Sequence, residues 1–102
     1  MKLIDVRTED GSRHFARLPE GADWDALCNH LKQLPEVSVA QLVAEWTAEP
    51  RIEFTYQDHR CTVRRQEDEY CFFVRDPRCS DVPLYRLALH CERLLAIAAV
   101  SR

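Results

Sequence analysis

Cys79 is the residue of this chain whose type and position best suit reaction chemistry. It lies in the segment 76–80, next to Arg78 and just before an expected helix. A neighbouring guanidinium and a helix N-terminus both lower the pKa of a thiol, and the thiolate is the reactive form of cysteine. Cys79 is therefore a candidate reactive thiol, nucleophilic or redox-sensing. The alternative is a small, half-buried residue that closes a loop onto the core. We favour that alternative, because the sequence offers Cys79 no certain histidine partner.

The other cysteines and the histidines do not form a recognisable metal site. The chain has five cysteines and four histidines, with no C-x-x-C motif. Cys71, Cys79 and His90 could surround a zinc ion, but their spacing matches no closed four-ligand pattern. We therefore expect no disulfide framework, no bound metal and no cofactor. A thiol-based redox or metal-binding activity centred on Cys79 is the alternative function.

Acidic residues gather in two short clusters, Glu9 with Asp10 and the segment 67–69. Both clusters are expected at turns, whereas catalytic acid–base pairs need a shielded pocket that shifts their pKa. The sequence also contains no glycine-rich phosphate loop and no G-x-S-x-G motif. These observations predict that the protein is not an enzyme.

Arginines beside aromatic residues suggest RNA binding, since aromatic side chains on a sheet can stack on bases. Arg60, Arg64 and Arg65 would be the basic residues of such a site. The aromatic residues fall mostly on the expected core face, however, and Glu53 and Glu69 flank Arg64 in the expected sheet. The formal net charge is -3 at pH 7, so no overall field attracts a polyanion. We expect no nucleic-acid partner.

A candidate interaction surface lies on the expected sheet face opposite the core. Its members are Thr55, Thr62, Cys71 and Phe73. Arg60 and Arg75 frame this patch, and an exposed apolar patch of this kind can bind a partner or a second copy of the chain. The alternative is that the N-terminal hairpin or a loop folds over Phe73.

The segment 51–75 must position these residues, and its side-chain pattern predicts a three-stranded antiparallel meander. Two-residue turns are expected at Asp58-His59 and at Gln66-Glu67. The expected apolar rows are Phe54, Val63 and Tyr70, followed by Tyr56, Cys61 and Phe72. The expected charge ladder on the other face is Glu53, Arg64 and Glu69. This register puts Cys61 and Cys71 on opposite faces, and a one-residue slip would destroy both patterns.

A hairpin and a helix are expected before the meander. The dipeptide Asp10-Gly11 predicts a turn between two short strands, which would pair Val6 with Phe15. The segment 22–34 has the apolar stripe of an amphipathic helix, with Asp23 as its N-cap and a proline as its stop.

The segment 36–47 fits two structures. A capping pattern near its start could open a short helix. Alternatively, its alternating apolar residues could form a strand that pairs Trp46 with Ile52. We favour the strand, because the β-branched residues Val37 and Val39 directly follow a helix stop.

The C-terminal segment has the clearest helical pattern in the chain. Ser80 or Asp81 would cap it, and Pro83 would lie in its first turn. Its apolar stripe consists of Leu84, Leu87, Ala88, Cys91, Leu94, Leu95 and Ala98. Arg86 and His90 fall on the opposite, polar face, so truncation of either residue is expected to leave stability unchanged.

Together these elements predict a single α+β domain over residues 1–102, a length near the commonest domain size. Both helices need an apolar partner, and the apolar face of the meander supplies one. The expected fold is a two-layer sandwich, with an antiparallel sheet of five or six strands and two helices on one face, in the order ββαββββα.

Composition gives the remaining expectations on function. Hydrophobic residues make up 46% of the chain and charged residues 30%, which is typical of a soluble globular protein. The N-terminal segment lacks the apolar core of a signal peptide, and no apolar run could span a bilayer, so we expect a cytoplasmic protein without a membrane partner. Twelve arginines against two lysines point to a bacterial source with a GC-rich genome. We predict a small non-enzymatic protein-interaction or regulatory module, whose partner is another protein or a second copy in a homodimer.

Overall fold

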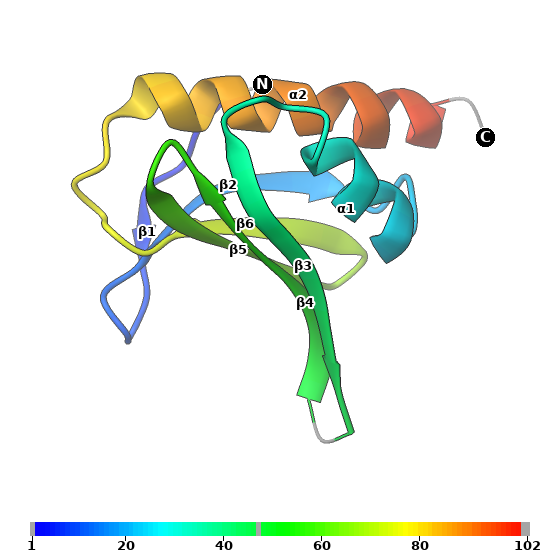
Figure 1. Ribbon diagram of the computed structural model, residues 1–102, viewed down its shortest axis with the longest axis horizontal. Coiled ribbons are helices and arrows are strands. Elements are labelled where there is room, and N and C mark those ends of the chain that lie inside the picture. Colours follow the sequence, from blue (N-terminus) through cyan, green and yellow to red (C-terminus); the bar gives the residue numbers. More distant parts are fainter. Residues whose placement is uncertain (1, 47, 101–102) are drawn as a thin grey trace.

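In the computed structural model, which describes residues 2–46 and 48–100 with side chains to residue 96, six antiparallel strands form one sheet (Figure 1). The strands are β1 (Val6–Arg7), β2 (Arg13–Pro19), β3 (Val37–Glu45), β4 (Ala48–Tyr56), β5 (His59–Gln66) and β6 (Glu69–Val74). Their spatial order is β1-β2-β6-β5-β4-β3. Helix α1 (Trp24–Leu31) follows β2, and helix α2 (Asp81–Val100) follows β6. The expected α+β fold and element order are confirmed.

Strands β4, β5 and β6 form the expected meander, but both turns lie one residue away from their expected positions. Gln57 and Asp58 form the first turn with φ angles of 49° and 66°, and Glu67 and Asp68 form the second with 50° and 64°. Positive φ at both central residues is the geometry of a type I′ turn, whose twist matches that of the flanking strands. Both registers therefore differ by two residues from the expected ones.

The two-residue shift leaves each meander side chain on its expected face but changes its neighbours, because facing alternates with a period of two. The observed apolar rows are Ile52, Val63 and Phe72, followed by Phe54, Cys61 and Val74. The expected apolar rows were wrong. The expected charge ladder was wrong as well, since Glu53 lies opposite Thr62 and Arg64 lies opposite Cys71.

Strand β2 pairs with β6, and the short strand β1 pairs with β2 at the edge of the sheet. Val6 of β1 pairs with His14, so the expected Val6–Phe15 pair was wrong. The β2–β6 register shifts between His14 and Ala16, which is the signature of a β-bulge. Phe15 lies in this irregularity and is fully buried, with its ring 6.2 Å from that of Phe72.

The ambiguous segment 36–47 forms strand β3, as favoured from the sequence. Leu42 lies opposite Ile52, so the expected Trp46–Ile52 pair was wrong, and Trp46 is fully exposed. The register also shifts between Ser38 and Gln41, where Val39 has a φ of 53° and is exposed. Figure 1 shows that β3 and β4 extend beyond the other strands as a hairpin arm.

The two helices begin where the sequence predicted. The side chain of Asp23 accepts a hydrogen bond of 2.8 Å from the Ala26 amide and so caps α1, which ends at Leu31 rather than at residue 34. Helix α2 begins at Asp81, and the expected stripe residue Ala98 lies outside the residues whose side chains are described. Neither helix, over its described residues, combines the length and apolarity required to cross a bilayer.

Both helices pack against the same face of the sheet and close one apolar core. Its fully buried side chains include Leu27 and Leu31 from α1, Leu84, Leu87 and Leu95 from α2, and Ile52, Val63 and Phe72 from the sheet. Tyr70 anchors the segment before α1, because its hydroxyl donates a 2.6 Å hydrogen bond to the Ala22 carbonyl. The ring of Trp24 packs edge-on against Tyr70 at 4.9 Å.

A buried arginine ties the N-terminal segment to α2. The guanidinium of Arg13, only 7% exposed, donates to the Ile4 carbonyl from Nε at 3.1 Å and from Nη2 at 2.8 Å. Its third donor, Nη1, lies 2.8 Å from a carboxylate oxygen of Asp81 in the first turn of α2. Asp5 lies 3.4 Å from the same guanidinium. Each of the three guanidinium nitrogens therefore has an oxygen partner, which offsets the cost of burying the charge.

Candidate functional site

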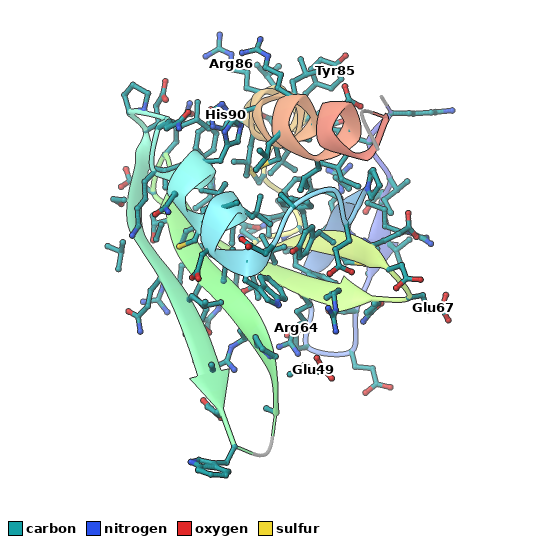
Figure 2. The ribbon with its side chains drawn as sticks, turned by 90° about the vertical axis from the view of Figure 1, so that its right-hand side faces the viewer. Glu49, Arg64, Glu67, Tyr85, Arg86 and His90 are labelled. Carbon is teal, nitrogen blue, oxygen red and sulfur yellow. The ribbon has the colours of Figure 1, made fainter. Side chains whose placement is uncertain are left out.

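The face of the sheet that carries no helix is hollowed into a groove of about 980 Å³. Figure 2 shows Arg64 on this side of the sheet, whereas Tyr85 and Arg86 lie on the far side of the molecule, on α2. Residues of β4, β5 and β6 form the floor of the groove, and the β1–β2 hairpin and β3 form its walls. Three of the four candidate interaction residues line it: Thr55, Thr62 and Phe73.

The floor is built from adjacent side chains on three neighbouring strands. Thr62 lies opposite Phe73, and Thr55 lies opposite Arg60. Arg75 follows the end of β6 and donates its backbone N–H to the Arg60 carbonyl at 2.9 Å, which places the two arginines beside each other. Thr55, Thr62 and Phe73 therefore lie together on this face, with Arg60 and Arg75 beside them.

The N-terminal wall is a loop held in shape by one carboxylate. Asp10 accepts hydrogen bonds from the Thr8 hydroxyl, from the Ser12 hydroxyl at 2.6 Å and from the Ser12 amide at 3.0 Å. These hydrogen bonds, together with the more distant charge of Arg64, hold the pKa of Asp10 well below its usual range. Gly11 completes the loop with a φ of 88°, a conformation that suits glycine.

The N-terminal hairpin covers part of the expected surface. The imidazole of His14 stacks on the Phe73 ring, with centroids 4.8 Å apart and planes inclined by 28°. Phe73 remains half-buried, whereas Cys71 is only 1% exposed, beside Arg17 of β2. Cys71 therefore lies on the expected face but is not accessible to a partner. The His14 contact could not be found from the sequence, because nothing local indicates that β2 lies beside β6.

Some arginines in and beside the groove form ion pairs with carboxylates of the chain, and others do not. Arg51 forms ion pairs with Glu53 at 3.1 Å and with Glu45 at 3.6 Å, next to the groove. Within the described part of the chain, no ion pair involves the lining residues Arg60, Arg64 or Arg75. Unpaired guanidinium groups beside an apolar ring are suited to recognition of a partner's carboxylates.

Two titratable groups at the groove have shifted pKa values. A lowered pKa makes the Asp10 carboxylate a weak base at neutral pH. Burial raises the pKa of Cys61, behind the floor, to about 12, so its thiol stays protonated. Thr62 lies opposite Glu53, whose carboxylate accepts a hydrogen bond of 3.1 Å from Arg51. This carboxylate is therefore already engaged within the chain.

Cys79, the candidate reactive thiol, lies away from the groove in the loop between β6 and α2. It is buried, with 6% of its surface exposed. Burial raises its pKa, the charge of Asp76 adds to the rise, Arg13 opposes it, and Asp81 adds again. The lowered pKa that the reactive-thiol alternative requires is therefore contradicted, because desolvation outweighs the positive charge of Arg13.

Alkylation of the folded protein provides a test of the thiol. All five cysteines are free and buried, so we expect iodoacetamide at pH 7 to label Cys79 no faster than Cys28 or Cys91, because thiolate fraction and access limit the rate. Mass spectrometry of quenched time points measures the rates. Rapid labelling of Cys79 well below pH 8, with the other thiols silent, would instead establish it as a reactive thiol.

Two histidines, 60 positions apart in the chain, join the helices, and no sequence pattern predicted their contact. Each imidazole donates from Nε2 to the other residue's backbone carbonyl, His30 to His90 and His90 to His30, both at 2.6 Å. The rings stack at 3.9 Å with planes inclined by 13°. His90 is therefore half-buried in the α1–α2 contact rather than solvated on a polar helix face, and we expect its truncation to lower stability.

Because of His14 and His90, we expect the free energy of unfolding to fall with pH before the carboxylates begin to be protonated. Burial lowers the pKa of His90 and of His14, so both are neutral in the folded protein. In the unfolded chain their pKa is about 6.5, so the unfolded state binds more protons below that value. Their contribution is complete above pH ~6.5 and is lost as pH falls through the lower folded pKa.

Urea melts at a series of pH values between 8 and 5 measure this effect. The midpoint should fall as pH drops below 6.5, and the fall should be smaller in His90→Gln, which cannot be protonated. His59→Gln, at a turn-flanking position without these contacts, is the control and should keep the wild-type pH dependence. A midpoint that stays constant down to pH 5 would contradict the prediction.

The described residues contain no group of three histidine, cysteine or carboxylate side chains placed to hold a metal ion. Comparison of the chain with protein-family models, with curated proteins and with solved structures finds no match. The groove on the helix-free face is therefore the candidate site on which a functional proposal rests.

Proposed function

We propose that this protein is a non-enzymatic protein-interaction or regulatory module, and that the groove binds its partner. The observation that carries the proposal is the arrangement of the floor: a half-buried Phe73 beside Thr62, with unpaired arginines around them. An apolar centre within a polar rim is typical of protein–protein contacts. The opposite face of the sheet is covered by both helices, so the groove is the sheet surface open to a partner.

A separate protein is the partner that we propose for this surface. In a two-fold symmetric dimer the same patch of both copies would form the interface. Face-to-face association would bring the arginines Arg60, Arg64 and Arg75 of both copies into one interface, where they would need carboxylates of the other copy as partners. A homodimer through the groove remains the alternative, and sedimentation distinguishes the two.

The proposal places the protein in a bacterial cytoplasm, without a nucleic-acid or membrane partner. Five free, buried thiols suit a reducing compartment. The high arginine content supports the bacterial source, and the net charge of -3 supports a partner other than a polyanion.

Site-specific photocrosslinking tests the proposed surface. With benzoylphenylalanine in place of Thr62, irradiation of cells of the source organism should give a discrete adduct, because Thr62 lies on the groove floor. The same probe in place of the exposed Tyr85 on α2 is the control and should give none. An adduct with the mass of two chains would identify a homodimer, and the absence of an adduct from Thr62 would refute the interaction surface.

The variant Phe73→Asp tests whether the apolar centre of the groove is needed for binding of the partner. A carboxylate in the apolar centre should abolish the Thr62 adduct, or convert a homodimer to monomer in sedimentation, because the interface would have to bury the charge. The isolated variant should keep its circular dichroism spectrum, since Phe73 is half-exposed. A folded variant that gives an unchanged adduct would show that the contact lies elsewhere.

A further inference from the structure

We infer that the partner presents an acidic, extended polypeptide segment to the groove, and that Arg60 and Arg75 bind its carboxylates. This inference rests on the proposed function, because it specifies the chemistry of the segment that occupies the same surface. It is carried by the charges around the groove: at one end two arginines lie side by side, and neither forms an ion pair with another described residue.

Arg60 of β5 and Arg75, which directly follows β6, form a like-charge pair. The Arg75 N–H bonds to the Arg60 carbonyl at 2.9 Å, and both side chains are exposed and line the groove. Like charges directly opposite each other in a sheet destabilise it. A bound carboxylate between two guanidinium groups would remove this repulsion and add charge-assisted hydrogen bonds.

Two of the three acidic residues that line the groove are bonded within the chain. The Glu53 carboxylate lies 3.1 Å from Arg51, and Asp10 accepts hydrogen bonds from Thr8 and Ser12 of its own loop. Among the described residues, no ion pair involves the lining arginines, and Arg60 and Arg75 lie side by side at one end of the groove. A complementary ligand is therefore acidic at that end.

The same charges favour a polypeptide over a nucleic acid. Glu9, Asp10 and Glu53 line the groove, and a continuous phosphate backbone would have to pass these carboxylates. Phe73 is the aromatic ring of the outer-face floor, and His14 already stacks on it, so no free platform for bases is available there. A polypeptide can place two or three carboxylates at the basic end and neutral residues beside Thr55 and Thr62.

Titration with simple probes tests the inference. Capped hexaglutamate, added to isotope-labelled protein at low salt, should shift the amide resonances of Thr62 and Phe73 in a saturable way. The double variant Arg60→Gln/Arg75→Gln should bind about tenfold more weakly. The control Arg86→Gln/Arg93→Gln removes the same charge from exposed positions on α2 and should bind as wild type. Neither arginine forms an ion pair with another residue that the structure describes.

The outcomes separate this inference from the proposed function. Equal weakening in both double variants, no shifts at the groove, or tighter binding of hexauridylate than of hexaglutamate would each overturn the acidic-peptide assignment. In cells, a Thr62 crosslink that is lost in Arg60→Gln/Arg75→Gln supports it. A Thr62 crosslink that persists in that variant leaves the interaction surface intact and refutes the acidic segment alone.

Discussion

Leu87→Ala is expected to lower the free energy of unfolding by about 2 to 5 kcal/mol, the range for leucine truncations in a packed core. Leu87 is fully buried on the face of α2 that packs on the sheet. Truncation removes apolar contacts and leaves a cavity that rigid neighbours from the sheet cannot fill. A loss of this size is a large share of the total stability of a domain of this length.

Urea denaturation measures the effect, with two comparisons on the same helix. Arg86→Ala, at the neighbouring exposed position, should change stability by less than about 0.5 kcal/mol. Leu94→Ala should cost less than Leu87→Ala, because Leu94 is only partly buried against the core. Similar losses at Arg86 and Leu87 would mean that α2 packs through a different face.

Arg13→Ala is expected to cost about 2 to 3 kcal/mol, because it leaves the Ile4 carbonyl without its two guanidinium donors and removes a charged hydrogen bond. Asp81→Asn should cost much less, since Asp81 is 69% exposed and Arg13 would keep its bonds to Ile4. The exposed Arg7→Ala, on the paired strand, is the control and should be nearly silent.

Amide hydrogen exchange gives a second, local measure of the Arg13 contact. The Ile4 amide donates to the Phe15 carbonyl at 2.9 Å, so its protection reports whether the N-terminal segment stays docked. Protection of Ile4 should fall in Arg13→Ala by more than the global loss of stability explains. Unchanged Ile4 protection would show that Arg13 does not hold this segment.

The faces of the meander could be predicted from sequence, whereas its cross-strand partners could not. Moving a two-residue turn by one residue changes every cross-strand partner by two, so the alternation of Phe72 and Phe73 between the two faces survives the error. The turns themselves were ambiguous, because the chain uses Gln57 and Glu67 at positions that require positive φ. Asp58 and Asp68 follow these two residues. Aspartate tolerates positive φ better than most residues, and this tolerance was the sequence signal for the true turn positions.

The composition of the candidate site was predictable, but its shape was not. Alternation along three strands placed Thr55, Thr62 and Phe73 together. The walls of the groove depend on contacts between distant segments, above all on β2 lying beside β6, which brings His14 onto Phe73. Burial of Cys71 has the same origin. Such strand order is decided by packing of the whole chain rather than by any local pattern.

The position of Trp46 near the end of the β3–β4 arm has an optical consequence. Its indole is already fully surrounded by solvent in the folded protein, whereas Trp24 packs edge-on against Tyr70 at 4.9 Å. The native fluorescence spectrum is therefore the sum of a water-exposed emitter and a shielded one. Unfolding changes the environment of the second emitter alone, so a soluble quencher separates the signal of the arm from that of the core.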